Sequence, residues 1–113
     1  MHELAIALSV VDAVTERTGS APVAAVRVRV GRLAGVVPDA MRFCFELVTA
    51  GTPLEGATLE IERPEGRGRC RTCGEEFVLA DLLLLCSCGS ADVEVMAGRE
   101  LDVASVVMAA PTG

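Results

Sequence analysis

The chain has 113 residues, of which 51% are hydrophobic, and its formal net charge is −6. This length allows one compact core, alone or with a small appendage, that folds without disulfide bonds. The negative charge argues against nucleic-acid phosphates as a partner. Three Phe residues are the only aromatics, which leaves no stacking platform for bases.

The N-terminal segment lacks the features of a leader or a membrane anchor. It begins His2-Glu3, where a secretory signal needs positive charge. The apolar run "LAIALSVV" stops at Asp12, well short of the roughly 18 apolar residues of a membrane span. Five cysteines, an odd number, point to a reducing compartment and to metal or free thiols. We therefore expect a soluble, cytoplasmic protein that keeps Met1.

The first half of the chain predicts a helix, a strand, a helix and a strand. From Glu3 to Thr18 apolar residues recur at helical spacing, and Gly19 supplies a stop. "VAAVRVRV" alternates valine with arginine, as a strand with one buried face does. "VVPDAMRFCFELVTAG" has Pro38 near its first turn, and "ATLEIERP" alternates again until Pro64. The expected inward residues are Leu4, Ala7, Leu8, Val11 and Val14 in the first helix, and Met41, Cys44, Phe45 and Val48 in the second.

The second half begins with "EGRGRC", where Gly66 and Gly68 predict a flexible entry to a cysteine-rich insert. After Gly98, "ELDVASVVM" predicts a last strand. The expected fold class is α+β: a small sheet of about three strands with two helices on one face, plus an inserted zinc-ribbon-like domain. We expect one domain over residues 1–66 and 96–113, and a zinc-binding domain over 67–95.

The insert carries two cysteine pairs, Cys70-Arg-Thr-Cys73 and Cys86-Ser-Cys88. Four thiolates from two pairs suit tetrahedral Zn²⁺, and such a site leaves no open position for catalysis. Zinc would also explain how so short a segment folds, with only Phe77 and the "LLLL" run at Leu82 to Leu85 expected to be buried. The alternatives are a redox dithiol and unliganded thiols. The shorter second pair is expected to strain chelation. Cys44 lies on a helical apolar stripe and is predicted to be a core residue.

His2 is the only histidine of the chain. A terminal histidine is often simply solvated. However, the Met1 amine, the His2 amide nitrogen and the His2 imidazole can close adjacent chelate rings, and nitrogen-rich tetragonal sites favour Ni(II) or Cu(II). The first amides of a helix have no intrahelical acceptor. An amide there can therefore be deprotonated for metal binding without breaking a hydrogen bond of the helix.

The segments "MHELAIALSVVDAV", "VRVGRLAGVVPDAMRFCFELVTAGTPLEGATLEIERP" and "GRELDV", with the paired cysteines, resemble the HypA/HybF family of hydrogenase nickel-incorporation proteins. The resemblance implies a nickel site at Met1, His2 and Glu3, and a zinc site at Cys70, Cys73, Cys86 and Cys88. The family's second pair is commonly C-P-x-C, whereas this chain has "CSC". A second histidine, which some relatives place near nickel, does not occur here.

The resemblance further implies a nickel metallochaperone that is not an enzyme. It would bind Ni(II) as transferred cargo and Zn(II) as a structural ion, and act with a nickel-handling accessory GTPase. The recipient would be the large subunit of a [NiFe] hydrogenase, or a related nickel enzyme such as urease. No nucleic acid or membrane is expected as a partner, and the chain is expected to be a monomer or weak homodimer. The alternative function is a zinc-ribbon interaction module without nickel transfer.

Overall fold

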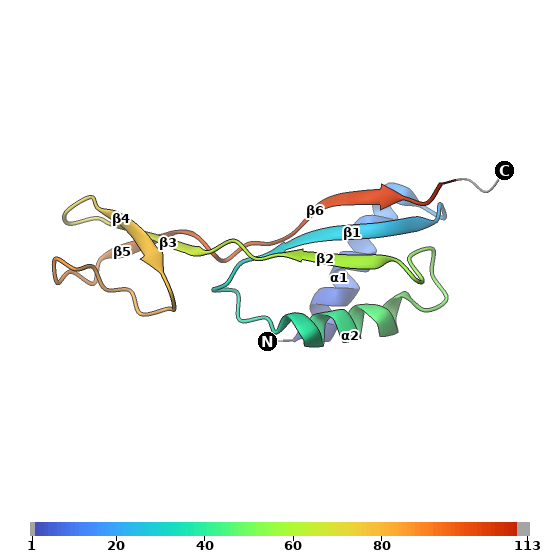
Figure 1. Cartoon of the computed structure of the whole chain (residues 1–113), viewed down its shortest axis with the longest axis horizontal. Helices are drawn as coiled ribbons and strands as arrows, with labels where there is room; N and C mark the ends of the chain where they lie inside the picture. The colour runs from blue at the N-terminus through green and yellow to red at the C-terminus, as the bar shows by residue number, and fades with distance from the viewer. Residues whose placement is uncertain (1, 111–113) are drawn as a thin grey trace. The chain divides into compact units, whose positions relative to one another are not determined.

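The computed structural model describes residues 2–110, and the chain divides into two compact units (Figure 1). The first consists of Met1–Arg29, Val36–Glu62 and Asp102–Gly113, and the second of Val30–Gly35 and Arg63–Leu101. Each unit has a three-stranded sheet of its own. The chain therefore leaves the first unit twice, at the end of β1 and after β2, and returns to it before α2 and again through β6.

The first unit is a helix-covered sheet. Its helices are α1 (Glu3–Thr18) and α2 (Pro38–Thr49), and its strands are β1 (Val23–Val30), β2 (Thr58–Glu62) and β6 (Leu101–Met108). The strand order is β2-β1-β6, with β1 and β2 parallel and Val26 beside Leu59. Ala109 N–H donates to the Pro22 carbonyl, which joins the end of β6 to the start of β1, so these two strands run antiparallel.

Both predicted helices form, and their ends follow the residues that predicted them. Gly19 has a φ of 59°, and its N–H donates to the Thr15 carbonyl at 2.9 Å, which closes α1. Glycine adopts this left-handed conformation without the steric cost that a Cβ brings. Pro38 occupies the first turn of α2, where its missing N–H costs nothing.

The predicted inward face of α1 was partly wrong. Leu4 and Leu8 are 50% and 47% exposed, whereas Val10, which was not predicted to face inward, is buried. The buried residues of α1 are Ala7, Val10, Val11 and Val14. Because α1 packs against α2 as well as covering the sheet, its buried stripe is turned toward Val10 and away from the two leucines.

Ion pairs cover the sheet face that the helices leave open. Val26 and Val28 of β1 are buried, while the alternating Arg27 and Arg29 are exposed. Arg27 Nε lies 3.4 Å from Glu60 on β2, and Arg29 Nε lies 2.9 Å from Asp102 on β6. These pairs link the central strand to both neighbours. The alternation seen in the sequence thus predicted the buried face correctly.

The second unit is built on β3 (Gly66–Cys70), β4 (Glu76–Leu79) and β5 (Val93–Ala97), in the antiparallel order β4-β3-β5. The prediction of a flexible segment at Gly66 and Gly68 was wrong, because both lie inside β3. A Cβ at Gly66 would collide with the Leu79 carbonyl oxygen and with Leu33. These glycines therefore serve close approach of neighbouring chain segments rather than flexibility.

The predicted α+β fold class is confirmed, with two helices in the first unit and a strand-rich second unit around four cysteines. Residues 2–110 contain six strands in two sheets, of which β3, β4 and β5 form the sheet of the cysteine-rich segment. Among residues 2–110, neither helix is long and apolar enough to cross a membrane.

Candidate metal centres

His2 stands at the start of α1, as the residue that precedes its first helical turn. The carbonyl of His2 accepts the first hydrogen bond of the helix, from Ile6 N–H at 3.1 Å. The imidazole makes no capping hydrogen bond, and the residue is exposed. Met1, the other predicted nitrogen donor, lies outside the described residues. The His2 side chain is therefore accessible and makes no hydrogen bond to any residue that the structure describes.

Glu3 connects the two helices at this end of the unit. Its Oε2 accepts a hydrogen bond from the backbone N–H of Val37 at 3.2 Å, and Val37 is the residue that precedes α2. A valine has no side-chain oxygen with which to cap a helix, and Glu3 supplies a carboxylate from the other helix instead. The bond from Val37 is the largest of the effects that lower the pKa of Glu3. The sequence carried no signal of this contact, because the two residues are far apart in the chain.

The second unit brings all four predicted cysteines together. Their Sγ atoms lie within 4.8 Å of one another. Cys70 Sγ is 3.7 Å from Cys88 Sγ, and Cys73 Sγ is 3.6 Å from Cys86 Sγ. A tetrahedron with Zn–S bonds of about 2.3 Å has sulfur–sulfur edges of about 3.8 Å. The donor set and its spacing therefore fit one tetrahedral Zn²⁺ ion with no position left open.

The shorter second pair reaches this arrangement through a tighter turn. In the first pair Gly74 N–H donates to the Cys70 carbonyl at 2.8 Å, and in the second Gly89 N–H donates to the Cys86 carbonyl at 2.9 Å. The second turn is one residue shorter. Gly74 and Gly89 have φ values of 79° and 92°, which favour glycine. "CSC" thus still directs both of its sulfurs toward the cluster.

The two turns are also joined outside the sulfur cluster. Thr72 Oγ1 and Ser90 Oγ are 2.8 Å apart. Arg71 donates to Asp92 twice, from its backbone N–H to the carbonyl and from its guanidinium to the carboxylate, each at 2.9 Å. Contacts of this kind orient metal ligands and restrict their movement. No pattern in the sequence marked these four residues.

The neighbouring thiols have widely different pKa values. The Cys73 N–H donates to Cys70 Sγ and lowers the pKa of Cys70 to about 6, against the opposing effect of burial. The Glu75 N–H lowers the pKa of Cys73, but the contact with Cys86 and burial outweigh it and raise the value to about 12. Thiolates that share a site repel one another, so a bound cation is needed for all four to ionise together.

The second unit has a small apolar interior, in which Leu33 and Leu79 are buried beside the cluster that contains the cysteines. Cys70, Cys86 and Val93 form its buried cluster, with Phe77 and Leu84 packed against them. The expectation that the "LLLL" run would be buried was wrong, because Leu82, Leu83 and Leu85 are 51–69% exposed. So few buried apolar side chains make a metal ion the main candidate for holding this unit folded.

Cys44 lies apart from the sulfur cluster, on α2 in the first unit. It is half-buried, on the same side of the helix as the buried residues Met41 and Phe45. The structure therefore does not bring Cys44 to the four-cysteine group, and its predicted core role matches its partial burial.

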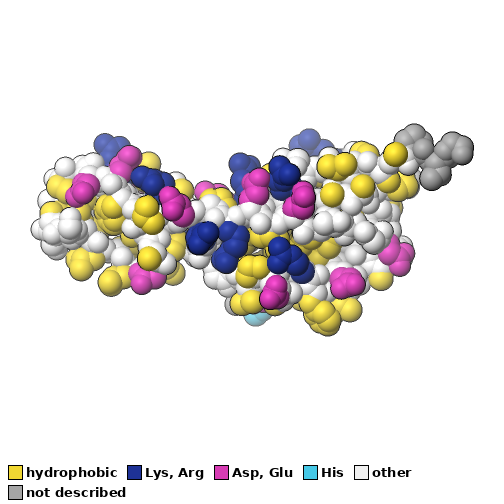
Figure 2. Space-filling view, in the orientation of Figure 1, with side chains coloured by type: hydrophobic (Ala, Val, Ile, Leu, Met, Phe, Trp, Pro, Cys, Tyr) yellow, Lys and Arg dark blue, Asp and Glu magenta, His cyan; other side chains and the backbone are white. Residues whose placement is uncertain are grey.

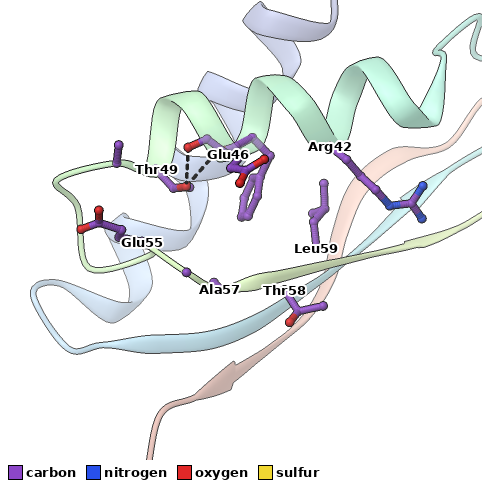
Figure 3. A pocket seen from close by; sticks show the side chains of 10 residues that line it. Arg42, Glu46, Thr49, Glu55, Ala57, Thr58 and Leu59 are labelled. Atoms are coloured by element: carbon purple, nitrogen blue, oxygen red, sulfur yellow. Dashed lines mark hydrogen bonds between the residues drawn. The ribbon is translucent and has the colours of Figure 1, made fainter.

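A cavity of about 580 Å³ lies between α2 and β2 (Figure 3). Phe45 and Leu59 form its buried floor, and Arg42, Glu46 and Glu55 stand at its rim. Thr49 closes one side, with its hydroxyl donating to the Phe45 carbonyl at 2.8 Å. Histidine and cysteine are absent from the residues that line this cavity. It offers neither a soft metal site nor a nucleophile paired with a base.

Comparison with known proteins identifies the family. The family described as "Hydrogenase/urease nickel incorporation, metallochaperone, hypA" matches residues 1–108. The chain belongs to the HypA family. Hydrogenase maturation factor HypA from Nostoc punctiforme is 44% identical over 106 residues, which is 94% of each chain. HypA from Chlorobaculum tepidum is 47% identical over 109 residues, which is 93% of this chain and 96% of its own.

Solved structures of HypA share the fold. The solution structure of the Ni metallochaperone HypA from Helicobacter pylori aligns with a TM-score of 0.68 at 20% identity, covering 98% of this chain and all of that one. A second HypA solution structure gives a TM-score of 0.69 at 21% identity and covers 98% of both chains. The resemblance read from the sequence is thus confirmed. This HypA-family chain is a nickel metallochaperone of the hydrogenase and urease incorporation class.

Proposed function

We propose that this chain binds Ni(II) through its N-terminal residues and delivers it to the large subunit of a [NiFe] hydrogenase. The observation that carries the proposal is the position of His2, exposed and without a capping bond at the start of α1. The N–H groups at this point have no helical acceptor, so that metal binding there costs the helix no hydrogen bond. An exposed site of few protein ligands also suits a carrier, which has to release its metal.

The proposed nickel ligands are the Met1 amine and the amide and imidazole nitrogens of His2, with Glu3 beside them. Because the Glu3 carboxylate already accepts the Val37 N–H, binding nickel through that carboxylate competes with the link to α2. We therefore assign the fourth position to the Glu3 amide, to solvent or to the recipient protein. In each case Glu3 would hold the ligand-bearing end of α1 against α2.

In the second unit we propose Zn(II) as a resident structural ion held by Cys70, Cys73, Cys86 and Cys88. Zinc supplies no chemistry to the cargo here, since four thiolates complete its coordination. The four sulfurs would hold the end of β3, the turn between β3 and β4, and the turn after β4 in one arrangement. On this basis residues 1–66 and 96–113 form a nickel-binding domain, and residues 67–95 a zinc-binding domain.

The proposed partners are a nickel-handling GTPase and the hydrogenase large subunit, in the cytoplasm, with the chain acting as a carrier and not as an enzyme. The family description also includes urease, which is the second candidate recipient. The alternative, a zinc-ribbon interaction module without nickel transfer, differs in one measurable respect: its zinc unit would be intact, but its N-terminus would not bind nickel.

Nickel titration of His2→Ala against Asp12→Ala tests the proposal. Asp12 is exposed on the same helix, about 15 Å farther along at 1.5 Å per residue. Its carboxylate is a hard ligand, and we expect its removal to leave nickel binding unchanged. We expect one Ni(II) per chain in wild type and Asp12→Ala, and none in His2→Ala, with zinc content equal in all three. Equal nickel binding by His2→Ala would place the nickel site elsewhere, and a wild type that binds no nickel would support the interaction-module alternative.

A further inference from the structure

The strand β6 forms an open edge of the first unit's sheet. It runs for eight residues with Asp102 as its only charged residue, and that charge is paired with Arg29 at 2.9 Å. Val107 and Met108 are 56% and 41% exposed. Figure 2 shows hydrophobic side chains gathered over the part of the surface that β6 occupies in Figure 1. Such an edge presents unpaired N–H and C=O groups to any strand that can reach it.

The opposite edge of the same sheet is protected. The strand β2 has five residues, of which Glu60 and Glu62 are charged, and Pro64 follows it closely. Short length, charge and proline are the features that prevent edge-to-edge pairing. One edge of this sheet is therefore blocked and the other, β6, is not.

A groove runs beside the middle of β6. It encloses about 470 Å³ between the last turns of α1 and the segment Val103–Val106. Glu16 and Arg17 lie on its α1 side. Neither makes an ion pair with any residue of the described chain. Two adjacent, unpaired and opposite charges thus flank the centre of the open strand.

We propose that β6 pairs antiparallel with β6 of a second copy of this chain, with the pairing centred on Ser105. A two-fold axis at that point joins the two sheets into one of six strands and makes the contact self-complementary. It sets Ser105 opposite Ser105 and each Asp102 opposite Met108 of the second copy, so that no like charges face each other along the strands. The same axis brings Glu16 of one copy toward Arg17 of the other, twice over.

This dimer leaves the nickel end of each copy free. Glu3 begins α1 and Glu16 lies near its end, about 20 Å away along the helix axis. The pairing goes beyond the proposed function, because nickel binding at His2 does not depend on it. Loss of the dimer and loss of nickel binding can therefore be told apart in the same sample.

The first experiment is sedimentation velocity on the untagged protein at near-physiological salt, at concentrations up to about 1 mM, where even a very weak dimer is populated. Ser105→Lys places two lysines against each other at the axis and should raise the dimer Kd by about tenfold or more. The matched control is Thr58→Lys, an exposed position on β2 at the other edge, which should leave the Kd unchanged. A wild type that stays monomeric throughout overturns the proposal, and so does equal dimerisation of Ser105→Lys.

A charge exchange provides the second experiment. Glu16→Arg and Arg17→Glu each set like charges across the axis, and each should weaken its own dimer by about tenfold. An equimolar mixture of the two variants should form a heterodimer, since all facing charges are then opposite. Glu55→Arg, which makes the same charge change beside β2, should associate as wild type does. Failure of the mixture to associate more strongly than either variant alone overturns the two-fold arrangement.

Discussion

The Glu3 carboxylate of α1 accepts a hydrogen bond from the backbone N–H of Val37, the residue before α2, at 3.2 Å. This contact fixes the starts of the two helices to each other, beside the proposed nickel ligands. It also gives the second residue after Met1 a structural role that the sequence did not reveal, since an acidic residue in a first helical turn is favourable on its own.

The first prediction concerns Glu3→Gln, which keeps the side-chain shape but removes the charge. Because the Val37 N–H lowers the pKa of Glu3, the ionised carboxylate stabilises the fold above the unfolded-state pKa of about 4.3, and this stabilisation is lost as the pH falls through the folded-state value. Urea unfolding at neutral pH should show Glu3→Gln to be less stable than wild type, and the difference should disappear in acid. Glu16→Gln is the control. A difference that persists in acid would contradict this assignment.

The second prediction concerns the sulfur cluster. Purified protein should contain one zinc ion per chain, and Cys73→Ser should release it. In a two-dimensional NMR spectrum the amide signals of β3, β4 and β5 should then collapse, while those of α1, β1 and α2 stay dispersed, because little else holds the second unit. A zinc-free second unit that keeps its dispersed signals under reducing conditions would show that the metal is not structural.

The third prediction separates Cys44 from that cluster. Cys44→Ala should cost about 1 kcal/mol of stability by removing a half-buried sulfur from the α2 core, and zinc content should not change. Metal analysis and denaturant unfolding on the same preparation check both statements. Zinc loss in this variant would mean that Cys44 is a ligand after all.

The fourth prediction follows from the glycines of β3. Gly66→Ala forces its new Cβ into the Leu79 carbonyl of β4 and should destabilise the second unit by about 1–3 kcal/mol. The neighbouring Arg67→Ala is the control, since Arg67 is exposed. Hydrogen exchange of the β4 amides should rise in the first variant alone. Unchanged exchange would mean that β3 and β4 can separate without cost.

The sequence predicted what depends on neighbours along the chain. Gly19 and Pro38 marked helix ends, and the valine–arginine alternation of β1 marked a buried and an exposed face. Prediction from the sequence failed where contacts between distant segments of the chain decide the local structure. Gly66 suggested flexibility until Leu79 was seen against it, and Leu83 suggested burial although the second unit has no interior large enough to cover it. The cysteine spacing predicted the cluster because metal chelation imposes a local rule, whereas the contact between Glu3 and Val37 follows no local rule.

The most direct test of nickel carriage is titration of the untagged protein beside the same protein extended by a few N-terminal residues. An extension turns the Met1 amine into an amide and should abolish a planar, nitrogen-rich Ni(II) spectrum while zinc content and folding stay unchanged. In the untagged protein the affinity should fall in acid, since protons compete with nickel for its nitrogen ligands. Unaltered nickel binding by the extended protein would contradict the account.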